Sequence, residues 1–459
     1  MHAQVQARGS QRLLAGLVVT SLLLAACGGT SQASASPQAS ATPEATAEPI
    51  TLKVWLGGEP GTVNAQTKLM DEYHQLNPNV TIETTFQGTE LTNPTLLPAL
   101  GSGSGPDIWG GGTGPGQPAS IISAGYALDL SPYYFKYGWD KIIPPTVVDS
   151  TSSDGKLWAV GDSVETTMFL YNKTIFEKAG VSVPTTWAEF IAAADKLKAA
   201  GYKTVIGLAA ADKWPISHLQ SWLWGAYAGP DGINNVLFGN GRWDDKPFVD
   251  AMQTLVDLGK AGYFGSDALA IGFQDYMAKF QRGEIPMTFT GTFVVGDMLA
   301  ALGADGLKDF GVFAAPNPSG GPIYPSEDIG SGWYINAKSP HVDQAADLLN
   351  FWFFRPESRK LLLEDALVPV GPLDLTGVNL PSLQEAALAI NDQYRGNGTI
   401  HAFLDTVMPA NTADLTYDGL QALLAGKMTP LEFSQSIEKA WEEAKAKGDI
   451  LKPGGVVQP

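Results

Sequence analysis

The sequence predicts an α/β protein with two lobes, and three observations lead to this fold class. The chain has 459 residues, which is enough for two lobes that each bury a core. Its first folded segment has the order strand, helix, strand, which is typical of a parallel sheet. Further along, the apolar and β-prone residues 157–170 are interrupted by Gly161-Asp162-Ser163. A strand interrupted by a polar patch is expected where a chain crosses between two lobes past a cleft.

Composition excludes several other classes of protein. The formal net charge is -18 and no basic run is present, which argues against a partner that is nucleic acid or an anionic membrane surface. The single cysteine, Cys27, leaves neither a disulfide within the chain nor a zinc site made of thiolates. The 12 Trp and 14 Tyr residues indicate either ordinary packing or a ligand cleft lined with aromatic rings.

The N-terminal residues 1–26 have the pattern of an export signal. Arg8 and Arg12 precede an apolar stretch, residues 13–26, that is too short to span a bilayer comfortably. The stretch ends in Leu-Ala-Ala-Cys27-Gly, which resembles a bacterial lipobox. We therefore expect the mature protein to begin at a lipidated Cys27, because several acyl chains hold a protein on a membrane where one would not. The alternative is an ordinary cleavable signal followed by a chance cysteine.

Residues 27–49 are predicted to form a disordered tether. They consist mainly of Ser, Ala, Thr, Pro, Gln and Glu, with almost no large apolar side chain, so they cannot build a core. A random coil of this length reaches roughly 25 Å, and its prolines lengthen it. The tether would separate the folded part from the membrane.

The folded part opens with a strand at residues 50–55, a helix, and a second strand at 80–86, followed by a short strand at 107–109. Parallel sheets of this kind bind ligands in the loops at the carboxyl ends of their strands. Two such loops contain candidate contacts, namely Glu59 after the first strand and Gly110 to Gly116 after the short one.

Two helices follow the interrupted strand. The first ends at Gly180, which suits a C-cap. The second begins at a capping box made by Thr186 and Glu189 and ends at Gly201. These signals place helices directly after the crossover.

Several motifs occur in one order along the chain: G-S-G-P-D at 103–107, D-G-K at 154–156, V-E-x-x-x-x-x-Y-N-K-x-x-F-x-x-A-G at 164–180, P-T-T-W-A-E at 184–189, F-Q-R-G-E-I-P-M-T-F-T-G-T-F at 280–293, and G-S-G-W-Y-I-N-A at 330–337. The set resembles the extracellular solute-binding proteins of ABC importers, family 1, the sugar-binding branch that is maltose-binding-protein-like. Two departures from the family pattern are Pro286, where alanine is usual, and Phe293, where tryptophan is usual and often stacks on sugar.

The resemblance implies the type II periplasmic-binding-protein-like fold, with a cleft between lobes that are joined by crossover hinge segments. Lobe 1 would comprise residues 50–165 and 330–372, and lobe 2 residues 166–329 and 373–459. It also implies a monomeric receptor without cofactor, outside the cytoplasmic membrane in the periplasm or at the cell surface. The receptor captures a carbohydrate and delivers it to a membrane permease that a separate ATPase drives.

A neutral sugar presents hydroxyls, which carboxylates bind well, and apolar faces, which aromatic rings cover. Glu165 is the first candidate contact, because the matching glutamate of the resembling family touches sugar. The other candidates are Glu59, Asp162, Trp109, Trp214, Trp222, Trp224, Phe293 and Trp333. For each tryptophan, packing in a core is an equally good interpretation.

Catalysis is not indicated by the sequence. The nucleophile elbow, the phosphate-binding loop, the complete dinucleotide fingerprint and the H-E-x-x-H motif are all missing. The four histidines of the expected mature protein, His74, His218, His341 and His401, are scattered and are interpreted as structural or exposed, and no metal site is expected. Acidic pairs such as Asp244-Asp245 suggest a glycosidase dyad only weakly.

Three alternatives remain beside a sugar receptor. A receptor for a sugar phosphate would need cations in the cleft, for which Arg242, Arg282 and Arg355 are available. A surface glycoside hydrolase would need two carboxylates at catalytic separation. A structural surface protein would show no change on adding a ligand.

Overall fold

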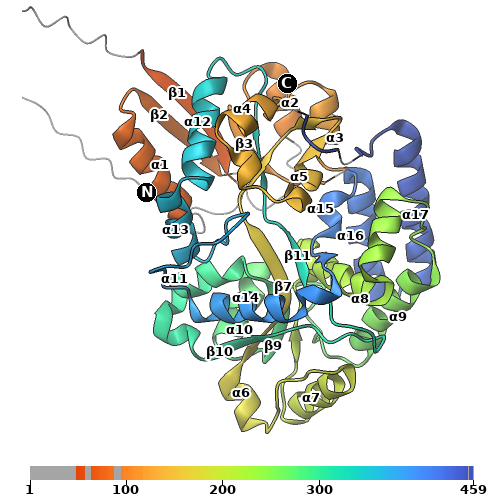
Figure 1. The fold of residues 1–459 in the computed structure, drawn as a ribbon. Helices are drawn as coiled ribbons and strands as arrows, with labels where there is room; N and C mark the ends of the chain where they lie inside the picture. Colours follow the sequence, from red (N-terminus) through yellow and green to blue (C-terminus); the bar gives the residue numbers. More distant parts are fainter. Residues whose placement is uncertain (1–47, 57–63, 87–94, 115, 453, 458–459) are drawn as a thin grey trace, which may run out of the picture. The chain divides into compact units, whose positions relative to one another are not determined.

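The computed structural model describes residues 48–56, 64–86, 95–114, 116–452 and 454–457 (Figure 1). The described residues belong to one compact unit that spans 47–459. The predicted export signal, Cys27, nearly all of the tether and Glu59 lie outside the described residues.

The first lobe is built on a five-stranded sheet in the order β2-β1-β3-β12-β6. β1 pairs in parallel with β2 and with β3, as the strand-helix-strand order predicted. β12 then joins β3 antiparallel and carries β6 at its other edge. The strands are β1 (Ile50–Leu56), β2 (Val80–Phe86), β3 (Ile108–Gly111), β6 (Val160–Gly161) and β12 (Gly332–Ile335).

Alternation along β1 explains how this sheet is covered. Leu52, Val54 and Leu56 are buried in the main core of the lobe, whereas Trp55 packs against a smaller cluster that includes Trp109. Successive side chains of a strand point to opposite faces, so the two cores lie on opposite faces of the sheet. The helices and short strands of the lobe are α1 (Asn64–Leu76), α2 (Leu96–Ser102), α3 (Ala119–Ser123), α4 (Ser131–Lys136), η1 (Trp139–Lys141), α5 (Pro145–Thr151), β4 (Ser152–Ser153), β5 (Lys156–Leu157), α12 (Val342–Phe353) and α13 (Pro356–Glu364).

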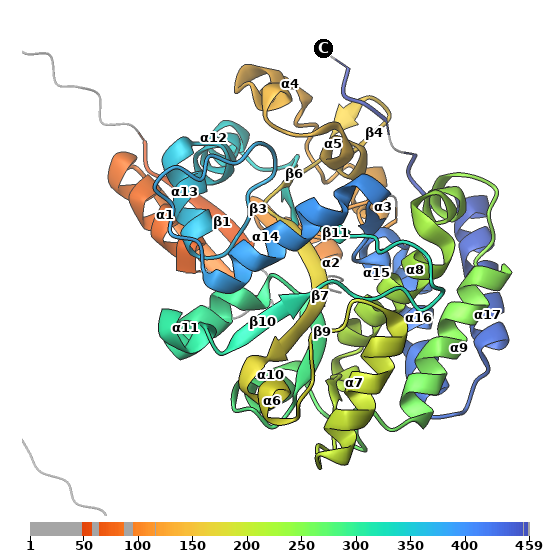
Figure 2. The same ribbon diagram turned by 60° about the horizontal axis from the view of Figure 1, so that its bottom comes forward.

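The second lobe is organised around the nine-residue strand β7 (Val164–Asn172), which Figure 2 shows entering the lobe from the side of the first sheet. The sheet order is β13-β11-β7-β9-β8, with β10 also paired to β7. β7 is antiparallel to β9, β10 and β11, so the second sheet is largely antiparallel. Its other strands are β8 (Ile206–Gly207), β9 (Met287–Gly291), β10 (Phe310–Phe313), β11 (Ser326–Ile329) and β13 (Ile400–His401).

β7 divides the core of the second lobe in two. Phe169 belongs to the larger cluster, while its neighbours Met168 and Leu170 belong to the other, as the alternation of a strand requires. Helices therefore cover both faces. They are α6 (Lys173–Lys178), α7 (Trp187–Ala199), η2 (Ala210–Asp212), α8 (Trp214–Phe238), α9 (Lys246–Lys260), α10 (Phe273–Gln281), α11 (Val294–Leu307), α14 (Ser382–Tyr394), η3 (Arg395–Asn397), α15 (Leu404–Val407), α16 (Ala410–Leu424) and α17 (Pro430–Lys447).

Local signals in the sequence set the ends of several helices. The predicted capping box of Thr186 and Glu189 is present at the start of α7. The chain leaves α6 through Gly180 and α7 through Gly201, and both glycines have a positive φ, a conformation that favours glycine. Within the described ranges, no helix is both long enough and apolar enough to cross a membrane.

The last described residues return to the first lobe. The N–H of Val457 donates to the carbonyl of Gly155 at 2.9 Å, and the Ser152 hydroxyl donates to the carbonyl of Gly454. Val456 packs against the main core of the first lobe. The predicted boundaries assigned residues 373–459 to the second lobe, but this tail lies on the first.

Candidate functional site

The two sheets are joined by crossover segments that pair with each other. Gly161 pairs with Gly332 in the first sheet, and Val164 pairs with Ile329 in the second, so both chains cross between these positions. There the N–H of Asp162 donates to Ser331 and the N–H of Gly330 donates to Ser163, both at 3.1 Å. The crossovers thus form one hydrogen-bonded junction, which we call the hinge.

A third segment runs beside the hinge. The N–H of Val164 donates to the carbonyl of Val368 at 2.7 Å, and Ser163 forms an isolated bridge with Pro369. The guanidinium of Arg359 donates to the carbonyls of Val370 and Pro372, both at 2.8 Å. Three chain segments therefore meet at the hinge: the two crossovers and the segment of residues 368–372.

Asp162 braces the hinge. Its Oδ1 accepts hydrogen bonds from the N–H of Ser331 and the hydroxyl of Ser163, both at 2.9 Å, and its Oδ2 accepts one from the indole of Trp333 at 3.1 Å. Burial raises the pKa of Asp162 above its ordinary value, although these hydrogen bonds partly offset the effect. Both carboxylate oxygens and the Trp333 indole are thus occupied by the protein itself, and the Trp333 ring is buried in the first core.

Glu165 lies three residues further along and is far less engaged. Its carboxyl meets the Ser163 hydroxyl at 3.5 Å, and that hydroxyl is nearer to Asp162. Its side chain is half-buried. Burial raises the pKa of Glu165 to about 8, and the neighbouring charges of Asp162 and Asp328 add to the shift. The carboxyl therefore keeps its proton at neutral pH and retains both donor and acceptor capacity.

Asp328 stands opposite Glu165 in the β7–β11 pair and is buried. It accepts a hydrogen bond from the N–H of Ile329 at 3.0 Å and faces Nδ1 of His401 at 3.3 Å. Burial alone would lower the pKa of His401, but the hydrogen bond and charge of Asp328 hold it above its ordinary value. We call Asp162, Glu165 and Asp328 the hinge carboxyl cluster.

An aromatic cluster forms where four helices of the second lobe begin. It contains Trp214 at the start of α8, Phe273 at the start of α10, Phe293 before α11, Phe403 before α15, and His218 one turn into α8. Ring centroids lie 4.5 Å apart for Trp214 and Phe273, 5.8 Å for Trp214 and Phe293, and 4.7 Å for His218 and Phe403. Trp214 and Phe293 are half-buried, so part of each ring is accessible.

Two links join the aromatic cluster to the hinge. The hydroxyl of Thr292, the residue before Phe293, accepts a hydrogen bond from the N–H of Thr166, the residue after Glu165, at 3.1 Å. His401, which faces Asp328, lies two residues before Phe403. Among the predicted contacts, Trp214 and Phe293 thus share one cluster, and the residue after Glu165 is hydrogen-bonded to the residue before Phe293.

Sequence reasoning missed several residues at this place. His218 was interpreted as structural or exposed; it is buried within the aromatic cluster, its Nδ1 has no hydrogen-bond partner in the described residues, and burial lowers its pKa to about 3. Asp405 is buried on α15, accepts a hydrogen bond from Tyr417 at 2.7 Å, and has its pKa raised to about 6, chiefly by burial. No motif marked these residues, because only the fold brings them to the site.

The loop after β3 meets the second lobe. A Cβ added at Gly116 would lie 2.2 Å from the backbone nitrogen of Pro409, and one added at Gly114 would lie 2.6 Å from Val407. Gly114 and Gly116 of the predicted glycine segment therefore lie directly against the end of α15 and the residues that follow it. Trp109, just before it, is buried and stacks on Tyr334 with ring centroids 5.4 Å apart, so it belongs to a core.

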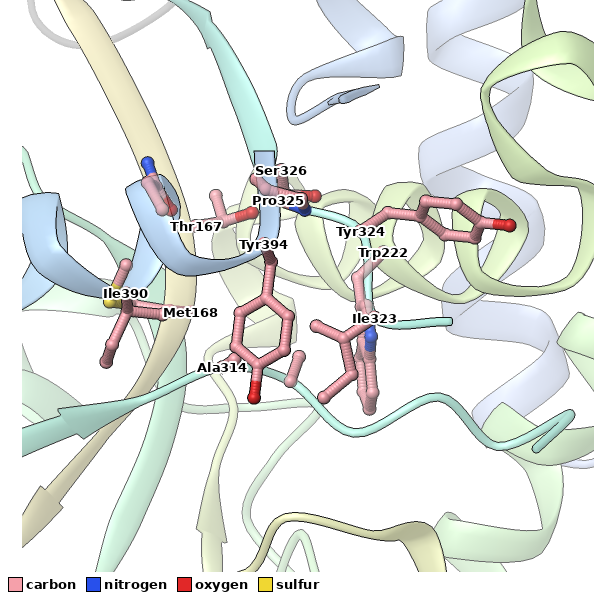
Figure 3. A pocket seen from close by; sticks show the side chains of 12 residues that line it. Thr167, Met168, Trp222, Ala314, Ile323, Tyr324, Pro325, Ser326, Ile390 and Tyr394 are labelled. Carbon is pink, nitrogen blue, oxygen red and sulfur yellow. The ribbon is translucent and has the colours of Figure 1, made fainter. Parts of the chain in front are cut away.

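Trp222 and Trp224 are both buried in the larger core of the second lobe. Trp224 stacks on Trp243 and its indole donates to the carbonyl of Phe248 at 3.2 Å, so it is a core residue. Trp222 lines a pocket of about 290 Å³, including space open to solvent, between α8, α14 and the loop before β11 (Figure 3). The buried hydroxyls of Thr167 and Ser326 line the same pocket and have no partner in the described residues.

In the part of the chain that is described, no group of three or more His, Cys, Asp or Glu side chains is arranged to hold a metal ion.

Comparison with protein families shows that residues 60–356 fit the family described as bacterial extracellular solute-binding protein. An uncharacterized ABC transporter extracellular-binding protein from Pyrococcus horikoshii is 26% identical over 62% of this chain and 66% of its own length. A probable sugar-binding periplasmic protein from Rhizobium meliloti is 28% identical over 32% of this chain and 29% of its own. An sn-glycerol-3-phosphate-binding periplasmic protein from Brucella abortus is 27% identical over 45% and 46%. The matches span less than two thirds of these relatives' lengths.

Solved structures with the same fold cover most of the chain. A chitin oligosaccharide binding protein superposes with a TM-score of 0.77 at 22% identity, over 87% of this chain and 99% of its own. A protein from a study of xylan utilization by Caldanaerobius polysaccharolyticus has a TM-score of 0.75 at 23% identity, over 85% and 100%. These similarities confirm the predicted two-lobed type II fold.

Proposed function

Because the chain belongs to the family of bacterial extracellular solute-binding proteins, we propose that it is the substrate-binding component of an ABC importer and captures a carbohydrate between its two lobes. The observation that carries this proposal is the position of Glu165. Its carboxyl has no strong partner of its own and lies at the hinge, linked through Thr166 and Thr292 to the half-buried ring of Phe293. A carboxyl with free hydrogen-bonding capacity and partly accessible aromatic rings are the two kinds of group that suit a sugar.

The proposed mechanism is a shift in population. A sugar whose hydroxyls meet Glu165 and whose apolar face meets Trp214 and Phe293 binds both lobes only when they are closed, so it favours the closed form. The closed form docks on the permease, and a separate ATPase drives transport. The chain acts as a monomeric receptor and carries out no covalent chemistry, so the sugar is released unchanged.

The proposal also includes the boundaries of the two lobes and a lipid anchor at the N-terminus. Residues 50–165 with 330–372 form lobe 1, and 166–329 with most of 373–459 form lobe 2. Residues 1–26 are an export signal, and lipid on Cys27 holds the receptor to the membrane through the tether of residues 27–49. Cys27→Ala should then move the protein from the membrane fraction to the soluble extracytoplasmic fraction.

Thermal unfolding and tryptophan fluorescence of the purified protein against sugars, polyols and sugar phosphates test the function. At a hundredfold excess over Kd, a bound ligand stabilises the folded state by about 2.7 kcal/mol, which raises the unfolding midpoint. A response to one sugar class, with the sugar recovered intact, supports the receptor. Consumption of the sugar would instead indicate a glycoside hydrolase, and silence across every sugar would exclude carbohydrates of that panel.

The main alternative is a receptor for a sugar phosphate, which the similarity to an sn-glycerol-3-phosphate-binding protein favours. The same panel separates the two, because it contains both classes of solute.

A further inference from the structure

We propose that the pocket between α8, α14 and the loop before β11 (Figure 3) is a second binding site, which takes a small uncharged diol or triol. None of the described residues that line this pocket belongs to the hinge carboxyl cluster or to the aromatic cluster. The second site therefore goes beyond the proposed function and does not depend on it. It follows from a break in the second sheet, from two hydroxyls in that break, and from the size of the space.

The pocket lies where one edge of β7 changes its partner. β9 is paired along one edge of β7, so β10 and β11 share the other edge. On that edge Phe169 is paired with Phe313, the last residue of β10, and Thr167 is paired with Ser326, the first residue of β11. Between the two strands the chain leaves the sheet at residues 314–325, which include four prolines. Since proline has no N–H for a strand ladder, this stretch does not continue β10, and a gap opens between β10 and β11.

Hydrogen bonds hold the loop that borders the gap. The buried amide of Asn317 donates to the carbonyl of Ala226 at 2.9 Å and to the carbonyl of Pro322 at 2.7 Å. The amide of Asn397 donates to the carbonyl of Ile323 at 2.7 Å. The walls of the pocket are thus fixed by the protein itself, as in most sites for small molecules.

Two buried hydroxyl groups lie opposite each other in the gap. Thr167 and Ser326 are partners in the β7–β11 pair, and their side chains lie close together in Figure 3. They are 4% and 3% exposed, and neither hydroxyl has a hydrogen-bond partner among the described residues. Leaving a buried polar group without a partner is costly. Because each hydroxyl can both donate and accept, an occupant with hydroxyl groups of its own satisfies the pair.

The other lining residues limit the charge and the size of the occupant. Among the described residues that line the pocket, none is Asp, Glu, Lys, Arg or His, so no charged side chain there compensates a charged ligand. The space measures about 290 Å³ with its opening to solvent included, which is below the roughly 300–1,000 Å³ of pockets for drug-sized ligands. A short-chain diol or triol therefore fits, and an oligosaccharide does not.

Water is the competing occupant, because it can also bridge two hydroxyls. A buried water typically has about three polar partners, whereas much of this pocket is aromatic or aliphatic. Trp222, Tyr324 and Tyr394 contribute rings, and Ile323 and Ile390 contribute alkyl groups. Such walls suit the C–H surface of an alcohol, so the lining favours an occupant that contains carbon.

The pocket adjoins the hinge through one of its walls. Asn391, which lines the pocket, donates to Oγ1 of Thr166 at 2.5 Å and to Oε1 of Glu327 at 2.7 Å. Thr166 follows Glu165 on β7, and Glu327 precedes Asp328 on β11. An occupant of the pocket would thus contact a side chain that ties the two crossover strands together beside the hinge.

Methyl NMR of the purified protein, labelled at Ile and Met, tests the second site with propylene glycol as the probe. We expect saturable shifts of the methyl signals of Ile323, Ile390 and Met168, which line the pocket. The signal of Met70, in the main core of the first lobe, should not move. A ligand with so few atoms binds weakly, so we expect a Kd that is roughly millimolar. Shifts that rise linearly without saturation, or that spread over both lobes, would show a solvent effect and overturn the proposal.

A hydroxyl deletion shows whether the pair in the gap binds the probe. Thr167→Val removes one hydroxyl with little change of shape, and we expect it to weaken binding of propylene glycol about tenfold. Thr81→Val, the same change at an exposed position of β2, is the control and should leave the affinity unaltered. If Thr167→Val does not fold, Ser326→Ala makes the same test from the opposite strand. A folded variant that binds the probe as tightly as the wild type contradicts the assignment.

Discussion

At the scale of single residues, neighbours in the sequence have different tasks. Asp162 and Glu165 are three residues apart, yet Asp162 is saturated by hydrogen bonds from Ser331, Trp333 and Ser163, whereas Glu165 has one long contact. Both were predicted to touch the ligand. Their surroundings assign bracing of the hinge to the first and leave the second free.

Glu165→Gln should change how stability depends on pH. The folded pKa of about 8 lies above the ordinary value of 4.5, so the stabilising contribution of protonated Glu165 is fully present below about pH 4.5 and is lost as pH rises through 8. Asp162 and Asp328 face this group, and His401 acts through Asp328. Between these pH values, the wild type should lose up to about 1.4 kcal/mol per pH unit relative to the variant.

Thermal unfolding of both proteins from pH 5 to 8.5 measures this difference. A difference in unfolding free energy that stays constant over the range would show that Glu165 does not titrate as its surroundings require.

The tryptophans provide a second residue-level prediction. Trp224→Phe keeps most of the ring in the core and should bind the identified sugar like the wild type, with a loss of stability. Trp214→Ala removes a half-buried ring and should weaken sugar binding about tenfold, or about 1.4 kcal/mol. It should also lower the midpoint of unfolding, because the ring packs on Phe273 and Phe293. Titration calorimetry and thermal unfolding of each variant give both quantities. Equal affinities of Trp214→Ala and the wild type would remove Trp214 from the binding surface.

At the scale of elements, β7 contributes both to the hinge and to the core of the second lobe. Its first residues form the hinge with β11, and its alternating later residues divide the core of the second lobe. The loop after β3 is the corresponding element of the first lobe, because Gly114 and Gly116 bring it against the end of α15. The contact of this loop with the second lobe therefore depends on two residues without side chains.

Gly116→Ala should prevent this contact. The added Cβ would lie 2.2 Å from the Pro409 nitrogen and 2.3 Å from the Met408 carbonyl carbon, and backbone atoms cannot rotate away. Overpacking of this kind costs about 1–3 kcal/mol, here by disfavouring the arrangement in which the lobes touch. We expect weaker sugar binding in calorimetry. Gly396→Ala, where an added Cβ meets nothing within 4 Å, is the control, and identical affinities for the two variants would count against a role for the loop.

At the scale of the whole molecule, two lobes are joined by three connections and a returning tail. Residues 454–457 extend from the second lobe to the hairpin β4–β5 of the first. Besides the three connections, this short segment is therefore a fourth contact between the lobes.

Closure on the ligand is the prediction at this scale. Small-angle scattering of residues 47–459 with saturating sugar should give a radius of gyration near the 22 Å or so expected for a compact chain of this length, and a larger value without sugar. A radius unaffected by a sugar that binds in calorimetry would mean that binding does not close the lobes.

Much of this architecture was predictable from local patterns. Alternation and turn residues identified the first parallel strands, the crossover at Gly161-Asp162-Ser163, and the capping box of α7. These features depend on residues that are neighbours in the chain, so they can be predicted from the sequence alone. The antiparallel second sheet was not predicted, since its partners β7, β9, β10 and β11 lie far apart in sequence.

By itself, then, the sequence determined the order of the elements, the crossover and the candidate Glu165. Only the tertiary structure decided which aromatic rings stay accessible, placing Trp224 and Trp109 in cores and Trp214 and Phe293 in one cluster. It also brought Asp328 and His401 together beside the hinge and His218 into the aromatic cluster. The physical reason is that periodicity reports whether a side chain is buried, whereas the partners of a buried or half-buried group are set by contacts between distant segments.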